Sequence, residues 1–170
     1  MSDATKPVRW QDSAWSWWWI TLLIVISDQV SKWWISSTFE LYESVQVLPF
    51  FSLTLVHNEG AAFSFLSNAG GWQRWFLLGT AAAIAIGLTI WGRRVRRNFK
   101  VEAIPLALIV GGAIGNVIDR AYLGYVVDFV DVYYDLYGPH FPAFNVADSA
   151  ISVGAAILVI GSFFVKDDEK

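Results

Sequence analysis

The chain contains no cysteine, and this absence excludes several kinds of chemistry at once. Disulfide bonds, thiolate nucleophiles, zinc–thiolate sites and iron–sulfur clusters all depend on cysteine side chains. Histidine is nearly as scarce, because only His57 and His140 are present and neither belongs to an HExxH pair that could bind catalytic zinc. The GxSG and GxGD motifs of intramembrane proteases are also missing from the sequence. We therefore predict neither a metal nor a cofactor.

Charged residues are also scarce in this sequence. Asp, Glu, Lys and Arg make up 16% of the 170 residues, whereas a soluble domain contains about 25%. Hydrophobic residues make up 55%, and the mean hydropathy is +0.45. This composition predicts an integral membrane protein. Because no internal repeat interrupts the pattern, residues 1–170 are expected to form a single domain.

Four stretches are candidates for crossing a hydrocarbon core of about 30 Å, which takes about 20 helical residues. They are residues 15–36, 72–91, 103–118 and 146–165. Tryptophans gather at the ends of the first two, as indoles do at the lipid–water interface. The first stretch contains Asp28 and Lys32 and has no small-residue cleavage site, so we expect it to be retained as a span.

The distribution of Lys and Arg predicts the orientation of the chain. A basic run at residues 93–100 joins the second and third spans and is expected to be cytoplasmic, because cytoplasmic loops are enriched in cations. Four spans then place both termini, with their own Lys and Arg residues, on the same side. Only Arg74 and Arg120 flank the outer side.

The long connection between the first two spans, residues 37–71, is expected to form structure outside the bilayer. Residues 44–56 are rich in β-branched and aromatic residues with partial alternation, which predicts one or two short strands interrupted by Pro49. Residues 61–66 predict a short helix at the membrane surface. The expected fold is mainly α, with four transmembrane helices, a small β-strand layer and a short surface helix on the outer side.

Polar residues that are costly in lipid fall at one depth in this topology. Four segments place charged or amide side chains near the outer boundary, namely Asp28, Lys32, Asn116, Asp119, Arg120, Asp128, Asn145 and Asp148. Asp128 stands between Val127 and Phe129, where a solvated surface acid is not expected. If Asp128 and Asp148 meet, the two carboxylates would share a proton and could activate water without metal, serine or cysteine.

Structural roles would also explain several of these residues. Asp28 and Lys32 are four residues apart on one helix face and could neutralise each other within the first span. Asn145 and Asp148 have the spacing of a capping box, in which Asp148 would bond back to the backbone of Asn145.

The region after the third span offers similar alternatives. Asp119 and Arg120 could form a pair at the helix end, with Arg120 facing the last carbonyl groups. Asp128 is expected in the loop that leads to the fourth span. Asp131 and Asp135 follow in a tyrosine-rich stretch and are expected to be exposed loop acids.

Five motifs together resemble the lipoprotein signal peptidases, the signal peptidase II family. They are Asp28-Gln-Val-Ser-Lys32, Asn58-Glu-Gly-Ala-Ala-Phe63, Gly115-Asn-Val-Ile-Asp-Arg120, Val127-Asp-Phe129 and Phe144-Asn-Val-Ala-Asp-Ser149. The resemblance runs from about residue 20 to residue 165 and includes all four predicted spans in order. The tryptophan-rich start and residues 133–140 have no counterpart in these motifs.

The resemblance implies an aspartyl endopeptidase of the bacterial inner membrane with its site near the periplasmic face and both termini in the cytoplasm. Such enzymes cut prolipoproteins on the N-terminal side of a cysteine that carries a diacylglyceryl group, and globomycin-type cyclic peptides inhibit them. The catalytic pair maps onto Asp128 and Asp148. The supporting residues map onto Asp28, Lys32, Asn58, Asn116, Asp119, Arg120 and Asn145. We expect a monomer in contact with membrane lipid and without a nucleic-acid partner.

Two functions of other classes compete with this interpretation. A small proton-coupled transporter or channel also needs intramembrane acids, but it predicts polar residues throughout the membrane depth rather than at one face. A non-catalytic scaffold would use the acids only as helix caps. Replacing Asp128 with Asn separates these functions, because a peptidase would lose turnover while a scaffold would be nearly indifferent.

Overall fold

The computed structural model describes residue 9 and residues 12–60, 71–95 and 100–164. A 3-10 helix, Ala14–Trp17, precedes the first long helix. The long helices of this part of the chain are α1 (Trp18–Thr38), α2 (Trp72–Gly92), α3 (Lys100–Tyr122) and α4 (Val146–Phe164). Its strands are β1 (Ser44–Leu48), β2 (Phe51–Asn58) and β3 (Val126–Val132).

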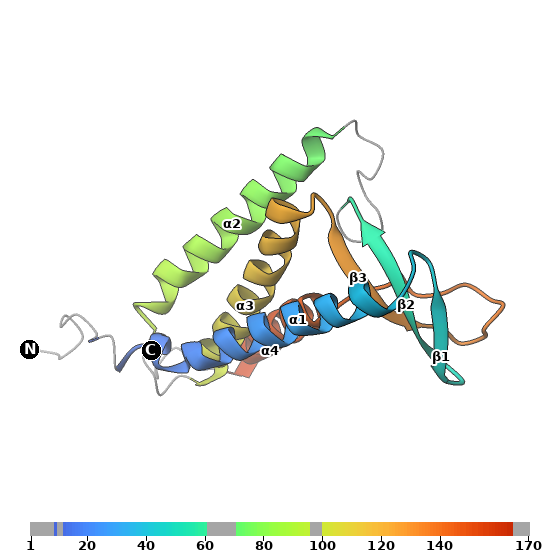
Figure 1. Cartoon of the computed structure of the whole chain (residues 1–170). Coiled ribbons are helices and arrows are strands. Elements are labelled where there is room, and N and C mark those ends of the chain that lie inside the picture. The colour runs from blue at the N-terminus through green and yellow to red at the C-terminus, as the bar shows by residue number, and fades with distance from the viewer. Residues whose placement is uncertain (1–8, 10–11, 61–70, 96–99, 165–170) are drawn as a thin grey trace, which may run out of the picture.

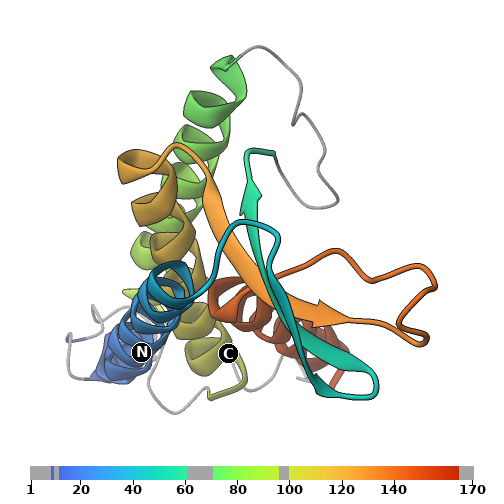
Figure 2. The same ribbon diagram turned by 45° about the vertical axis from the view of Figure 1, so that its right-hand side comes forward.

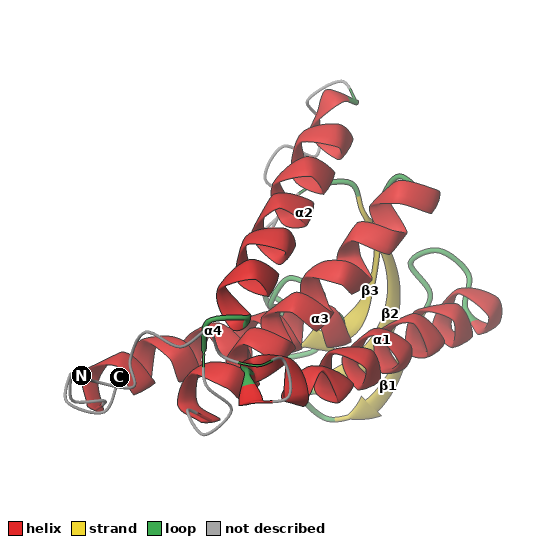
Figure 3. Cartoon of the chain, turned by 90° about the vertical axis from the view of Figure 1, so that its left-hand side faces the viewer, coloured by secondary structure: helices red, strands yellow, loops and turns green. Residues whose placement is uncertain are grey.

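Helix α3 is the centre of the helical part. It packs against α1, α2 and α4, and Figures 1 and 3 show it between α1 and α2. Helix α2 packs mainly against α3 and diverges from α1 towards its first residue. Twelve residues of α3 are buried, whereas α2 and α4 bury only three and four. The outward faces of α2 and α4 are therefore available to lipid.

Two glycines let three helices meet at one point. A Cβ atom at Gly112 would collide with the backbone of Ala147 at the start of α4. A Cβ atom at Gly115 would lie 2.5 Å from a carboxylate oxygen of Asp28 on α1. Small residues allow this close approach of helix backbones in lipid. The contact brings polar residues of α1, α3 and α4 to the same depth.

Three helices of the described part, α2, α3 and α4, are long and apolar enough to cross a membrane. Helix α1 has the same length as α2, 21 residues, but polar residues such as Asp28, Gln29 and Lys32 reduce its hydropathy. Long helices lie at the four predicted places in the described part of the chain, but four transmembrane helices remain a prediction. Helix α3 is also longer than the predicted span 103–118, since it contains 23 residues, so that Asp119 and Arg120 also lie on the helix, close to its end.

The strands form one antiparallel sheet in the order β1-β2-β3. The predicted strand pair is confirmed, with Pro49 and Phe50 in the turn between β1 and β2. The prediction that Asp128 lies in a loop is wrong, because residues 126–132 pair with β2 as a third strand. The surface helix predicted at residues 61–66 lies outside the described residues.

The sheet stands at one end of the helices, opposite the start of α1 and the end of α4 (Figure 1). An apolar cluster of Ile35, Leu55, Val127 and Phe129 fixes β2 and β3 against α1. After β3 the chain projects beyond the sheet and returns to begin α4, as Figure 2 shows. The sheet therefore holds β3 next to the first turn of α4.

Candidate active site

Asp128 is a buried acid on the central part of β3. Its side chain is 1% exposed and accepts hydrogen bonds from Asn58 Nδ2 at 2.9 Å and from Asn145 Nδ2 at 2.7 Å. Its neighbours Val127 and Phe129 pack in the apolar cluster beside α1. Because successive side chains of a strand point to opposite faces, this packing turns Asp128 towards Asn145 and α4.

Asp148 lies in the first turn of α4 and is part of a capping box. Its backbone N–H donates to Asn145 Oδ1 at 2.8 Å, and the Asn145 N–H donates to Asp148 Oδ2 at 3.3 Å. The structural alternative considered for this pair is therefore present. The cap leaves Asp148 Oδ1 to accept a hydrogen bond from Asn116 Nδ2 at 2.8 Å, so the carboxylate also belongs to the polar cluster.

Asn145 connects the two acids. Its side-chain amide donates to Asp128 while its backbone N–H donates to Asp148, and the residue is fully buried. One residue thus holds both carboxylates from opposite sides. Its Nδ2 atom also lies 3.3 Å from Asn116 Oδ1, which links the pair to the deeper part of the site.

The surroundings of Asp128 change its acidity. Burial, followed by the negative charge of Asp148, raises the pKa of Asp128 from 3.8 to about 7. Hydrogen bonds from Asn58 and Asn145 act in the opposite direction, because they stabilise the charged form. A carboxyl group with this pKa is present in both protonation states near neutral pH, as a general acid–base catalyst requires.

Lys32 is the buried cation beneath Asp128 and Asp148. It is 3% exposed, and its Nζ atom lies 2.8 Å from Asp28 Oδ2 and 2.9 Å from Asp119 Oδ2. Its third contact is a hydrogen bond to Asn116 Oδ1 at 3.0 Å. An ammonium group has three donors, and each has an acceptor here. The predicted Asp28–Lys32 pair is thus real but includes a second acid.

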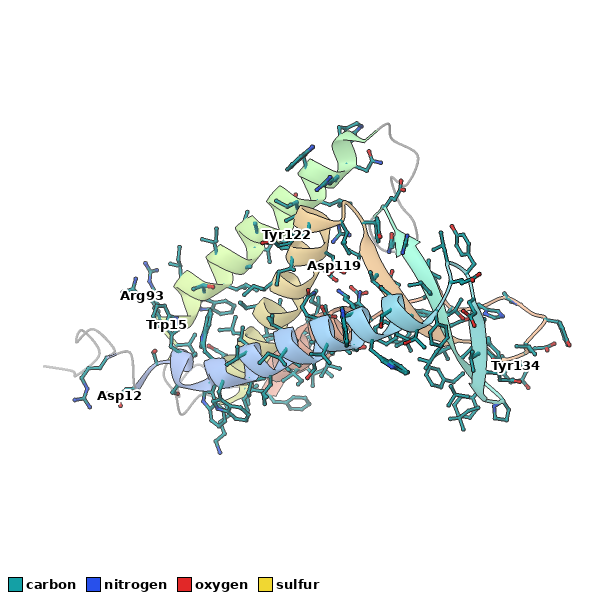
Figure 4. All side chains as sticks on the ribbon, viewed as in Figure 1. Asp12, Trp15, Arg93, Asp119, Tyr122 and Tyr134 are labelled. Atoms are coloured by element: carbon teal, nitrogen blue, oxygen red, sulfur yellow. The ribbon has the colours of Figure 1, made fainter. Side chains whose placement is uncertain are left out.

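The two acids around Lys32 also fix the backbone beside the candidate dyad. Asp28 Oδ1 accepts the N–H of Ala147, the residue before Asp148, at 2.9 Å. Asp119 Oδ2 accepts the N–H of Val127, the residue before Asp128, at 3.0 Å. Figure 4 shows Asp119 between α3 and the sheet, far from Arg93 and Trp15 at the opposite end of the helices. Each acid of the pair therefore stands next to a backbone anchor.

Arg120 has another role than the one expected from a helix-end pair. Its Nη2 atom donates to the carbonyl oxygen of Gly60 at 2.8 Å. The carbonyl oxygens of Arg120 and Ala121 at the end of α3 instead accept hydrogen bonds from Arg74 of α2, both at 2.8 Å. The structural alternative in which Arg120 faces these carbonyls is therefore wrong, because its side chain is buried on the side of the site. Asn58, whose Oδ1 accepts the Gly60 N–H at 3.0 Å, belongs to the same edge.

Gln29 is a member of the cluster that the sequence did not single out. Its Nε2 atom lies 2.9 Å from Asp119 Oδ1, 3.2 Å from Asp28 Oδ2 and 3.3 Å from the carbonyl oxygen of Gly115. The position of Gln29 within the motif of residues 28–32 could have indicated in the sequence that it belongs to the cluster. On the mainly apolar helix α1, these contacts provide the Gln29 amide with acceptors on two buried acids.

The prediction that Asp131 is an exposed loop acid is wrong. It is 7% exposed and lies on β3, where its oxygens contact Thr54 Oγ1 at 3.0 Å and His140 Nδ1 at 2.7 Å. This error arises because the sequence does not predict residues 126–132 to pair with β2 as a strand. Asp135, beyond the strand, is exposed as expected.

Comparison with known proteins identifies the family. The family model of signal peptidase (SPase) II matches residues 20–164. The chain belongs to the signal peptidase II family. The lipoprotein signal peptidase of Shewanella halifaxensis (strain HAW-EB4) is 50% identical over 165 residues, which cover 96% of both chains. That of Shewanella sediminis (strain HAW-EB3) is 51% identical over 166 residues, covering 96% of this chain and 92% of the relative.

Solved structures of a bacterial membrane enzyme have a similar fold. One described as a bacterial membrane enzyme has a TM-score of 0.78 and 32% sequence identity, and the match covers 91% of this chain and 92% of that one. As a member of the signal peptidase II family, the chain is an aspartic-type peptidase of the membrane. Among the described residues, no group of three or more His, Cys, Asp or Glu is arranged to hold a metal ion.

Proposed function

We propose that the chain removes signal peptides from prolipoproteins that carry a diacylglyceryl group, cutting on the N-terminal side of the modified cysteine. The family and the names of its relatives, lipoprotein signal peptidases, support the substrate class. The observation that carries the mechanism is the single buried residue, Asn145, that holds Asp128 with its side chain and Asp148 with its backbone. Asp128 and Asp148 are the proposed catalytic residues.

The proposed reaction uses one proton shared by the two carboxyl groups. Asp128 is the more buried acid and keeps the proton, in line with its raised pKa of about 7. Asp148 lies in the first turn of α4, where the helix dipole favours negative charge. The ionised Asp148 takes a proton from water as the water oxygen attacks the scissile carbonyl carbon, while Asp128 donates its proton to the carbonyl oxygen.

The second half of the reaction breaks the C–N bond. The tetrahedral intermediate returns its proton to Asp128 and expels the amine of the modified cysteine, which receives the proton that Asp148 took from water. The signal peptide leaves with a new carboxyl group, which then loses its proton to solvent, and both acids regain their starting states. No covalent intermediate forms, because water is the nucleophile.

The remaining polar residues are proposed to position the pair. Asn58 and Asn116 each donate to one acid, and Lys32 balances the negative charge beneath them. Asp28 and Asp119 hold the adjacent backbone, and Arg120 holds the Gly60 carbonyl at the edge of the site. We propose that the pair lies near the periplasmic face of the bacterial inner membrane, with four spans and cytoplasmic termini, so that a substrate anchored by its diacylglyceryl group presents its peptide bond at this depth. Globomycin-type peptides would occupy the same site.

The test is cleavage of a diacylglyceryl-modified prolipoprotein by purified protein in detergent. Wild type is compared with Asp128→Asn and Asp148→Asn, which keep the side-chain shape and one of the two acceptor oxygens but remove the acid. We expect both variants to lose about 10³-fold or more in turnover, as removal of a member of a catalytic unit does in other proteases. EDTA should have no effect and globomycin should inhibit the wild type.

Two outcomes would contradict the proposal. Full turnover in either variant would return that acid to a structural role. Inactivation by EDTA would point to a metal-dependent reaction. Melting curves of the variants separate loss of chemistry from loss of fold, and an inactive variant that keeps the wild-type melting temperature supports the catalytic assignment.

A further inference from the structure

A cleft outside the candidate active site lies where α2 begins, α3 ends and β2 ends. Figure 1 shows these segments gathered at one corner of the molecule. The cleft has a volume of about 310 Å³, and Glu59, Gln73, Arg74, Trp75 and Tyr125 are among its lining residues. None of these residues belongs to the proposed catalytic machinery, so the cleft calls for its own explanation.

Arg74 presents a charged donor to this cleft in a fixed orientation. Its Nε and Nη2 atoms donate to the carbonyl oxygens of Arg120 and Ala121, both at 2.8 Å. Its guanidinium carbon also lies 5.0 Å from the centre of the Trp75 ring. These contacts use one edge of the guanidinium and leave Nη1 next to Gly124, where a Cβ atom would lie 3.2 Å from it. The free edge of a fixed guanidinium is suited to a phosphate group.

The opposite charge is present in the same cleft but is not paired with Arg74. Glu59 lines the cleft and is exposed, yet no ion pair within 4 Å joins it to Arg74 in the described part of the chain. Tyr125 forms a further wall and is held by stacking on His57, with ring centres 3.9 Å apart. A cation and an anion that line one cleft without pairing to each other match a ligand that carries both charges.

The position of the cleft indicates what kind of ligand can reach it. Helices α2 and α3 are both long and apolar enough to cross a membrane, and the cleft lies at the ends where they leave it. Trp72 and Trp75, at the start of α2, are 53% and 65% exposed. Exposed indoles at the end of a span occupy the headgroup region of the bilayer. A phosphate-bearing headgroup is the abundant ligand at that depth.

We propose that this cleft binds the headgroup of a zwitterionic phospholipid. Arg74 contacts the phosphodiester, and Glu59 faces the ammonium group at the other end of the headgroup. A headgroup with a net negative charge would meet the Glu59 carboxylate without a compensating cation and should bind less well. A diacylglycerol, which has no phosphate, lacks the group that Arg74 recognises.

The test is lipid binding to the full-length protein, measured by native mass spectrometry as phosphatidylethanolamine is titrated into the detergent solution. Phosphatidylglycerol, diacylglycerol and the soluble compound glycerophosphoethanolamine are titrated in parallel. Arg74→Gln should weaken phosphatidylethanolamine binding about tenfold, as expected for loss of a charge-assisted contact. Arg9→Gln is the matched control and should have no effect, because Arg9 is distant in sequence and already paired with Asp12 at 2.8 Å.

If Arg74→Gln weakens the end of α3 and prevents folding, a second variant, Glu59→Gln, still tests the proposal. Glu59→Gln removes the acid without touching Arg74 and should abolish the preference for phosphatidylethanolamine over phosphatidylglycerol. Equal binding by wild type and a folded Arg74→Gln, or an unchanged preference in Glu59→Gln, would overturn the proposal. Diacylglycerol can also bind at the active site, so it would overturn the proposal only if Arg74→Gln weakened its binding as much as that of phosphatidylethanolamine. If glycerophosphoethanolamine binds as tightly as the lipid, the ligand is a soluble phosphate compound and the lipid assignment is wrong.

Discussion

Strand β3 carries two buried acids, Asp128 and Asp131, in very different surroundings. Asp128 faces the inner cluster, whose cation Lys32 and its two partner acids are each less than 5% exposed. Asp131 faces the outer side of the sheet, where its partner His140 has a side chain that is 35% exposed. Both acids have short contacts with nitrogen atoms, so distance alone does not distinguish them.

Access of water is the difference that matters. In the inner cluster, removal of one partner leaves a charge that water cannot reach, and the loss is several kcal/mol. At the outer pair, water can replace a missing partner, and the contribution to stability is small. The same strand therefore joins a region that must keep every partner to one that tolerates change. Four variants test this contrast.

Lys32→Met should have the largest effect on stability. The substitution keeps the length of the side chain but leaves Asp28 and Asp119 without their cation. We expect the free energy of unfolding to fall by about 3–5 kcal/mol, as for other buried pairs that lose one partner. Denaturant unfolding in detergent measures it. The control is Arg9→Met, which breaks an exposed pair and should cost less than about 1 kcal/mol. Similar losses in both variants would remove the contrast between dry and wet ion pairs.

Asp128→Asn should change how stability depends on pH. The pKa of Asp128 is about 7 in the folded protein and near 3.8 when the chain is unfolded. Between these values the folded state binds more protons, so wild-type stability falls as pH rises, by up to about 1.4 kcal/mol per pH unit. Asn cannot ionise, and the variant should therefore gain melting temperature relative to wild type at pH 8 more than at pH 5. Parallel curves for the two proteins would show that Asp128 has an ordinary pKa.

Much of the inner cluster could be predicted from the sequence, because lipid makes polar residues conspicuous. Asp28 and Lys32 stand out in an apolar helix, and their spacing already pairs them. The capping box of Asn145 and Asp148 follows from spacing as well. These predictions depend on the spacing of residues along the chain, which can be read directly from the sequence.

The outer region could not be predicted in the same way, because it depends on strand pairing. The sequence predicts a loop at residues 126–132, yet β2 supplies their hydrogen bonds from more than sixty residues earlier in the chain. That pairing buries Asp131 and brings it to Thr54. Gln29 was missed for a related reason, since its partner Asp119 belongs to another helix. Contacts between distant segments are set by packing, which one sequence does not display.

Gln29→Leu should have a smaller effect than loss of the charged partners. The substitution removes the donor to Asp119 Oδ1 but leaves the contacts of Asp119 with Lys32 and Val127. We expect a loss of about 1.5–3 kcal/mol in the free energy of unfolding, typical of a missing hydrogen bond to a charged group. Gln46→Leu on the exposed strand β1 is the matched control. If Gln29→Leu is as stable as Gln46→Leu, Gln29 does not support the cluster.

His140→Gln should have the smallest effect, confined to one pH range. The hydrogen bond that His140 donates to Asp131 raises the pKa of His140 above its usual 6.5. Protonated His140 therefore stabilises the folded state fully below about 6.5, and the stabilisation is lost as pH rises through the higher folded value. The measurement is the melting temperature of Asp128→Asn with and without His140→Gln, because this background removes the titration of Asp128 from the same range. The difference between the two proteins should shrink from pH 6 to pH 9, and the remaining part reflects the lost stacking on Tyr133 at 4.5 Å. Asp131→Asn should remove the same pH dependence. If the difference in melting temperature stays constant with pH, the outer pair carries no charge. The two ends of β3 would then differ in more than access of water.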